Sequence, residues 1–399
     1  MRFEKSSLRP AKRVNGCPPH SIFLSMRLFL LALFAASAGS EVSFREVILP
    51  AGPHAAMVTA ADLNHDSRPD LIVANLEDNA VTILLNDGGG RFHPAPGSPF
   101  NSGSQPNDFA VADFNRDAHQ DLAIVNTQTP FISIFLGDGR GRFHPAPGSP
   151  VRTESYPHPH GVAAGDFTGH GTVDLMTDSW GHNQIELLKG DGRGGFALGA
   201  FYNVGKRPYQ RSRAADLNGD GKADIVTTNL DGDSVTVLLG DGRGGFREAP
   251  GSPFPTAPAP WAVEIADVNR DGKPDLVVIP YDRDAKTRGG ASNVTVLIGD
   301  GSGKFTPLAG SPFSLQACAQ PTAVAAADLT GGPLLDIAVT CVNSSQIAFL
   351  TPGARGYRLS LRSLPGMPYG LAVADFFGTG RMSIAVSDSS RGTVTILRP

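Results

Sequence analysis

Oxygen-bearing side chains recur at a two-residue spacing in the stretch 216–224, which reads D-x-N-x-D-G-x-x-D. A glycine follows the third of them, and Asp224 closes the stretch at its ninth position. A hard cation such as Ca²⁺ takes about six to eight oxygen ligands, and a tight loop can supply them from positions one, three, five, seven and nine. An EF-hand would need a bidentate glutamate at position twelve, where this chain has Thr227. The stretch therefore predicts a Ca²⁺ loop of a different, shorter type.

The same stretch returns at a near-constant interval along the chain, which indicates a repeat architecture. Successive first aspartates are 51, 53, 50, 51, 61 and 47 residues apart, and the longest interval contains an insertion at 282–292. A repeat of about 50 residues has the size of one four-stranded propeller blade. The first aspartates of the seven units are Asp62, Asp113, Asp166, Asp216, Asp267, Asp328 and Asp375.

Each unit reads as four short strands, most clearly over residues 208–246. A small-residue strand at 212–216 precedes the loop, and two apolar strands follow at 224–229 and 234–239. A glycine-rich turn, G-D-G-R-G-G-F, then leads into the fourth strand at Phe246. We therefore predict an all-β fold, a seven-bladed β-propeller of four-stranded blades.

The two ends of the chain predict how the ring closes. The last unit stops at 393–397, which is its third strand, so its fourth strand is missing. The segment 43–46 (SFRE) matches the opening of a fourth strand at 246–248 (FRE). We expect the N-terminal strand to complete the last blade, which removes the exposed edges of an open sheet array.

The loop and the turn together resemble the FG-GAP or VCBS repeat, over about residues 42–399. That repeat forms the seven-bladed propeller of integrin α subunits and occurs in many exported bacterial proteins. The resemblance implies Ca²⁺ in the hairpin loop between the first two strands of a blade, at about four complete loops. The side-chain ligands that it implies are Asp62, Asn64, Asp66 and Asp70; Asp113, Asn115, Asp117 and Asp121; Asp216, Asn218, Asp220 and Asp224; and Asp267, Asn269, Asp271 and Asp275. The implied carbonyl ligands at position seven belong to Arg68, His119, Lys222 and Lys273.

Three loops depart from the pattern, and two of the complete loops lack its glycine. Ser67 and Ala118 replace the loop glycine in the first two units, which otherwise keep the full ligand set. The third, sixth and seventh loops lose ligands, and we expect no Ca²⁺ in the seventh. Their replacements are Thr168 and His170; Thr330 and Gly332; and Phe377, Thr379 and Ser383. The alternative for all these carboxylates is a polar turn capped by its own side chains.

Residues 1–40 are predicted to be an export signal region. Met26-Arg27 precedes an apolar run at 28–36 and a small-residue stretch at 37–40, the order of a signal peptide. The run is too short for a permanent membrane span. The native start is either Met1 or Met26. We expect a secreted or periplasmic protein, with the propeller at 41–399.

Charge and cysteine content limit the partners and the compartment. The net charge is −4; residues 1–40 carry six Lys/Arg and one Glu, so the rest of the chain is near −9. Without a basic stripe, nucleic acid is not an expected partner. Two of the three cysteines, Cys318 and Cys341, lie in the sixth unit, where an oxidising compartment permits a disulfide; two reduced thiols are the alternative.

The face opposite the Ca²⁺ loops is the expected ligand-binding surface. The sequence contains no G-x-S-x-G, no H-E-x-x-H and no phosphate-binding glycine loop. Aromatic and arginine residues, which dominate binding hot spots, gather in the segments expected at that face. They are Tyr156, His158, His160, Trp180, His182, Arg207, Tyr209, Arg211, Trp261 and Tyr281. The alternatives are ordinary loop packing, or a metal site formed by His158, His160 and His182.

Two function classes stay open at this point. The first is a non-catalytic binding or adhesion module for a protein or a glycan, monomeric, with Ca²⁺ as a structural ion. The second is an extracellular carbohydrate-active enzyme such as a polysaccharide lyase, which needs a base and a cation beside one uronate. Convergence of Arg207, Arg211, Tyr209 and a histidine in one cleft would favour the enzyme.

Overall fold

The structure is a computed structural model that describes residues 43–209, 211–281, 292–353 and 356–399. Residues 41–399 form one compact unit. The expected export signal at 1–40 and all but the last residue of the insertion at 282–292 lie outside the described residues. No helix in the described ranges is long and apolar enough to cross a membrane.

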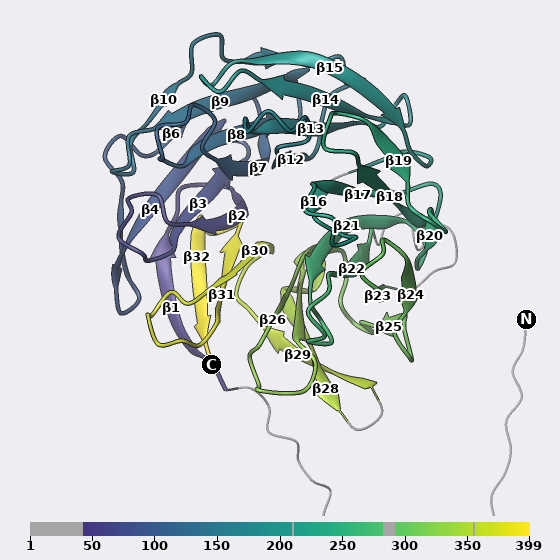
Figure 1. Cartoon of the computed structure of the whole chain (residues 1–399). Helices are drawn as coiled ribbons and strands as arrows, with labels where there is room; N and C mark the ends of the chain where they lie inside the picture. Colours follow the sequence, from purple (N-terminus) through teal and green to yellow (C-terminus); the bar gives the residue numbers. More distant parts are fainter. Residues whose placement is uncertain (1–42, 210, 282–291, 354–355) are drawn as a thin grey trace, which may run out of the picture. The chain divides into compact units, whose positions relative to one another are not determined.

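Seven antiparallel sheets follow one another around a ring (Figure 1), each a path of four strands from the ring axis outward. Blade 1 contains β2 (Ala55–Ala61), β3 (Asp70–Asn75), β4 (Ala80–Gly88), β5 (Arg91–Pro94) and the short β6 (Phe100–Asn101). Blade 2 contains β7 (Pro106–Ala112), β8 (Asp121–Asn126), β9 (Phe131–Gly137), β10 (Phe143–Pro145) and β11 (Val151–Arg152). Blade 3 contains β12 (Val162–Gly165), β13 (Asp174–Ser179), β14 (Gln184–Gly190) and β15 (Phe196–Asn203).

The remaining blades repeat this order. Blade 4 contains β16 (Arg213–Ala215), β17 (Asp224–Asn229), β18 (Ser234–Gly240), β19 (Phe246–Glu248) and β20 (Phe254–Pro255). Blade 5 contains β21 (Pro260–Ala266), β22 (Asp275–Pro280), β23 (Asn293–Gly299), β24 (Phe305–Pro307) and β25 (Phe313–Ser314). Blade 6 contains β26 (Pro321–Ala327), β27 (Asp336–Cys341), the 3₁₀ turn η1 (Val342–Ser344), β28 (Gln346–Gly353) and β29 (Gly356–Ser363). Blade 7 contains β30 (Pro368–Ala374), β31 (Ser383–Asp388), β32 (Thr393–Arg398) and β1 (Arg45–Pro50).

The second strand of every blade is buried along its whole length, as in β3, β8 and β17. Adjacent blades cover both faces of these strands, so apolar residues occur consecutively rather than in alternation. The third strands end in a glycine in blades 1 to 6. A Cβ on Gly240 would lie 2.3 Å from the carbonyl oxygen of Ala223, so only glycine lets the third strand approach the second here.

The N-terminal strand closes the ring, as the sequence predicted. β1 pairs with β32 in an antiparallel register that runs from Arg45 opposite Arg398 to Pro50 opposite Thr393. Phe44 stacks on Phe349 of blade 6 with ring centroids 5.0 Å apart. The last blade is therefore built from both ends of the described chain.

Cys318 and Cys341 form a disulfide with Cα atoms 5.1 Å apart. It ties the segment that enters β26 to the end of β27, and both cysteines are buried in the core between blades 5 and 6. The bridge spans 23 residues of sequence.

Replacing both cysteines by serine should destabilise the propeller by about 3 kcal/mol, because the unfolded chain regains the entropy of an open loop of this size. The measurement is the denaturant midpoint of the non-reduced protein and of the double variant. The control is the single variant Ser344→Ala, which removes a partly buried hydroxyl next to the bridge but leaves the bridge intact. A double variant as stable as the parent would contradict a stabilising bridge.

Candidate functional site

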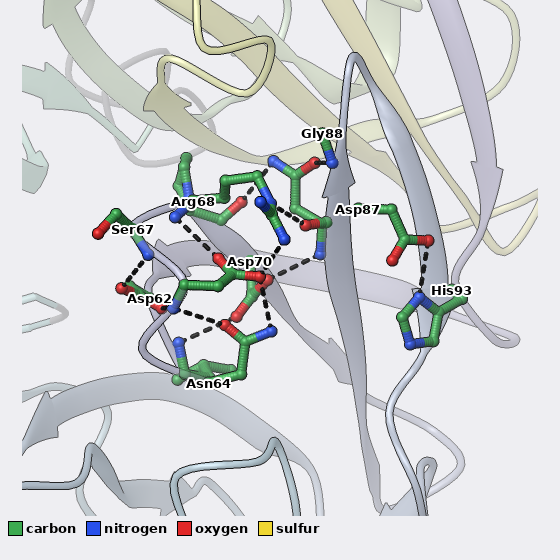
Figure 2. A network of polar contacts seen from close by, with 12 residues as sticks. Asp62, Asn64, Ser67, Arg68, Asp70, Asp87, Gly88 and His93 are labelled. Atoms are coloured by element: carbon green, nitrogen blue, oxygen red, sulfur yellow. Dashed lines mark hydrogen bonds and ion pairs between the residues drawn. The ribbon is translucent and has the colours of Figure 1, made fainter.

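The seven acidic loops lie at one end of the blades, each between the inner strand and the second strand. In the first loop (Figure 2), Asp62 accepts two backbone N–H groups, from Asp66 at 3.2 Å and from Ser67 at 2.8 Å. Asn64 accepts from the N–H of Asp66 at 3.2 Å and donates its amide to the Asp66 carboxylate at 2.9 Å. These side chains hold the loop in its tight conformation.

The aspartate at position nine is the most deeply buried carboxylate in each of the first six loops. Asp70 accepts the N–H of Leu63 at 2.9 Å and that of Asn86 at 2.7 Å, which links the loop to the third strand of the blade. The same pair of bonds is present at Asp121, Asp174, Asp224 and Asp275. This aspartate therefore joins the loop to the sheet whether or not it also binds an ion.

Several carboxylates lie close together in each complete loop. Burial raises the pKa of Asp70, Asp121 and Asp224 to about 6, against the backbone N–H groups that lower it, and the neighbouring loop carboxylates raise it further. A divalent cation would reverse this effect, because it favours the ionised carboxylates.

The donor set of the four complete loops fits a hard cation, since it consists of carboxylate, amide and carbonyl oxygens. Within the described ranges, however, no three His, Cys, Asp or Glu side chains are grouped closely enough to hold a metal ion. The carboxylates accept loop N–H groups instead, and in two loops the position-five carboxylate pairs with the position-seven side chain. These pairs are Arg68–Asp66 at 2.5 Å and Lys222–Asp220 at 3.2 Å. Ion binding would require them to exchange these contacts.

Two of the departing loops have a threonine at position three that forms a hydrogen bond with the aspartate at position nine. Thr168 donates its hydroxyl to Asp174 at 2.8 Å, and Thr330 donates to Asp336 at 2.9 Å. A threonine that donates to the buried aspartate supplies a favourable partner without any ion. The seventh loop has Ser383 where the others have this aspartate.

At the opposite end of the blades, seven of the ten predicted ligand-face residues come together in one connected cluster. Tyr209 is its centre: its ring centroid lies 4.1 Å from that of His160, 5.8 Å from that of Trp180 and 5.0 Å from that of Trp261. The guanidinium carbon of Arg207 lies 5.4 Å from the ring centroids of Trp180 and Tyr209. We call this group the aromatic cluster; its members are His158, His160, Trp180, Arg207, Tyr209, Trp261 and Tyr281.

The aromatic cluster contains polar atoms that lack partners among the described residues. The indole N–H groups of Trp180 and Trp261 are buried and donate to no acceptor there. His160 directs Nδ1 toward the Asp178 carboxylate at 3.5 Å, and Asp178 also accepts the N–H of Gly161 at 2.7 Å. Burial raises the pKa of Tyr209 to about 12, so its hydroxyl remains a donor at neutral pH.

The other three predicted residues lie outside the aromatic cluster. Tyr156, which is 60 % exposed, stacks on His182 with centroids 5.4 Å apart at the edge of the same face. His182 contacts Ser179 rather than the other two histidines. Arg211 is 5 % exposed and contacts Met57 through Nη2 and Sδ at 2.9 Å, in the central channel.

Sequence reasoning missed Asp178, which positions His160. Aligning the repeats would have found it, because the other blades place apolar or hydroxyl-bearing side chains at this position of the second strand. The equivalent residues are Ala74, Val125, Thr228, Ile279, Thr340 and Ser387.

The family comparison identifies the repeats. A profile described as "FG-GAP-like repeat" matches residues 62–124, 113–177 and 216–278. This chain contains FG-GAP-like repeats. The match runs through five of the acidic loops, so the FG-GAP resemblance expected from the loops and turns is confirmed, together with the seven-bladed arrangement. No curated protein matches the chain.

Solved structures similar to this FG-GAP-repeat propeller share its fold at low sequence identity. BBS1N in complex with ARL6DN is 15 % identical with a TM-score of 0.58, covering 89 % of this chain and 96 % of that one. A catalytically inactive virginiamycin B lyase from Staphylococcus aureus, with quinupristin, is 16 % identical with a TM-score of 0.56 and coverage of 90 % and 100 %. An Agrocybe aegerita lectin that recognises non-reducing terminal N-acetylglucosamine is 18 % identical with a TM-score of 0.51 and coverage of 91 % and 87 %.

Proposed function

We propose that this chain is an exported, Ca²⁺-stabilised propeller that acts as a non-catalytic binding or adhesion module for a protein or a glycan. The aromatic cluster is the observation that carries the proposal. Large rings, an arginine and unpartnered indole N–H groups are the features of a binding hot spot. FG-GAP-like repeats and similar propellers that bind a protein or a sugar are consistent with this role.

Export and the ions enter the proposal on separate grounds. The disulfide between Cys318 and Cys341 suits an oxidising compartment, secreted or periplasmic. The four complete loops present oxygen ligands of the kind that Ca²⁺ takes. In this proposal Ca²⁺ supplies rigidity only, and the residues of the opposite face contact the partner.

The experiment is a screen of the purified protein on glycan and secreted-protein arrays, followed by affinity measurements on each hit. Trp180→Ala should weaken binding by about thirtyfold or more, the usual size of a hot-spot loss. Phe201→Ala is the matched control, because Phe201 is an exposed aromatic residue on the outer strand of the same blade. Equal affinities of both variants and the parent would contradict a binding role for the aromatic cluster.

A polysaccharide lyase remains the second candidate, because part of the required constellation is present. Arg207, Tyr209 and His160 converge, and Asp178 accepts the backbone N–H of His160 at 2.8 Å and lies 3.5 Å from its imidazole. Arg211 lies apart from them, in the channel. Release of unsaturated uronates from acidic polysaccharides, followed by ultraviolet absorbance and abolished by His160→Ala, would favour the lyase over the binding module.

A further inference from the structure

A central channel of about 810 Å³ runs between the inner strands and contains a few charged side chains among many alanines. The alanines come from every blade except blade 5, for example Ala60, Ala110 and Ala372. The charged side chains come from blades 2, 4 and 5, together with Asp328 of the sixth loop. They are Asp108, Arg211, Arg213 and Glu264.

Arg211 forms no direct ion pair with a described carboxylate, although the charges of Asp108 and Glu264 act on it through space. Its guanidinium donates to the thioether of Met57 at 2.9 Å, and no described carboxylate lies within 4.0 Å of it. A thioether is a weak acceptor. A guanidinium that is 5 % exposed and lacks a strong acceptor is costly to the fold unless another group binds it.

The other charged groups of the channel do not neutralise Arg211. Arg213 lies 3.6 Å from Asp108 and donates to the carbonyl of Ser212 at 3.1 Å. Glu264 forms no ion pair with a described cation; burial raises its pKa, while the charges of Arg213 and Arg211 lower it. The buried hydroxyl of Ser212 also lacks a described partner. A guanidinium without an ion-pair partner and the hydroxyl of Ser212 therefore face the channel.

The inner strand of blade 4 is shorter than those of most other blades, and Arg211 lies just before it. β16 begins three residues before Asp216, whereas the inner strands of blades 1, 2, 5, 6 and 7 begin seven residues before the equivalent aspartate. Arg211 has a φ of +52°, which is unfavourable for a residue other than glycine. A Cβ on Gly161 would lie 2.5 Å from the Arg211 nitrogen, so blade 3 holds this backbone in place. The equivalent residues are Met57, Asp108, Gly161, Ala262, Ala323 and Gly370.

We infer that the central channel binds a small organic carboxylate through Arg211. A planar guanidinium matches a carboxylate with two parallel hydrogen bonds. One guanidinium without an ion-pair partner can bind one carboxylate, whereas a phosphate dianion would need a second free cation. The alanine walls suit the apolar body of an organic acid. This site goes beyond the proposed function, because it lies inside the ring and uses none of the aromatic cluster.

Isothermal titration of the full-length protein tests the ligand class without any variant. Benzoate, succinate and glucuronate would each be titrated beside benzamide, succinamide and glucuronamide. We expect at least one carboxylate to bind about tenfold or more tightly than its amide, because hydrogen bonds to charged groups are the stronger kind. If no carboxylate binds more tightly than its amide, the inference is wrong.

Variants then test the residue. Arg211→Met should abolish carboxylate binding, and Arg211→Lys, which keeps the charge but loses the planar fork, should weaken it by about tenfold. Arg193→Met is the matched control, since Arg193 is an exposed arginine on a turn. Thermal melts identify any variant that does not fold. If Arg211→Met does not fold, the affinity of Arg211→Lys for the carboxylate decides the test. Parent-like binding by a folded Arg211 variant, or equal loss in Arg193→Met, would overturn the assignment.

Discussion

Deleting residues 43–50 is expected to leave a chain that does not form a stable monomeric propeller. The deletion removes β1, which pairs with β32 along six residues, and exposes the edge of that strand. It also removes the buried side chains of Phe44 and Leu49, which pack in the cores beside blade 7. Two large apolar side chains contribute about 3–6 kcal/mol together. That loss is comparable with the whole stability of a typical domain, about 5–15 kcal/mol.

Size-exclusion chromatography and thermal unfolding measure this effect. Deletion of residues 1–40 is the control, because it leaves β1 intact, and it should give a monomer that unfolds cooperatively. A synthetic peptide of residues 43–50 should partly restore the melting transition of the shorter chain by adding a strand to the open edge. A soluble monomer that lacks residues 43–50 and melts at the parental temperature would contradict this role for β1.

Removing Ca²⁺ is expected to lower the melting temperature by many degrees. Each ion that binds only the folded chain stabilises it by about 2.7 kcal/mol at a free concentration of one hundred times its Kd. Four such sites would together contribute about 10 kcal/mol to the free energy of unfolding of the propeller. The measurement is a thermal melt with excess Ca²⁺ and with excess chelator.

One loop substitution separates this effect from general loop chemistry. Asp220→Asn removes a charge at position five and should reduce the number of bound ions by one, as counted by native mass spectrometry. Asp241→Asn is the matched control: Asp241 lies in the glycine-rich turn of the same blade and accepts the N–H groups of Arg243 and Gly245, which an asparagine can also accept. A melt that chelator does not change would refute structural Ca²⁺.

The repeats made the fold predictable from sequence. The spacing of the first aspartates gave the number of blades, and the match of 43–46 with 246–248 gave the closing strand, since both depend only on position in the chain. The apolar runs of the second strands follow from burial on both faces. Each of these features repeats, so one well-preserved unit explains the others.

The candidate sites were less predictable, because they depend on side-chain direction. Sequence placed Arg207 and Arg211 on one surface, but β16 begins only at Arg213, and Arg211, with its positive φ, lies in the channel. Likewise, the sequence predicts the Asp70 carboxylate as an ion ligand but does not reveal its bonds to Leu63 and Asn86, because Asn86 lies on the third strand of the blade. The direction of these side chains depends on residues that differ between the repeats, and a consensus sequence of the repeat does not contain them.

Links between neighbouring loops add a constraint that no single repeat contains. The imidazole of His65 lies 2.9 Å from that of His119 in the next loop, and Arg116 donates to the carbonyl of His170 at 3.1 Å. Arg270 pairs with Asp328 at 2.6 Å. Position four of a loop therefore contacts the following blade where its side chain is long.

The pairing of β1 with β32 also sets an order of events during synthesis. β1 leaves the ribosome first, but its partner strand is made about 340 residues later, so blade 7 cannot form until nearly the whole propeller has emerged. Blades 1 to 6 contain only strands that are close in sequence and can form as they appear. Throughout that interval β1 remains unpaired, and the growing chain is an open arc whose two ends must find each other last.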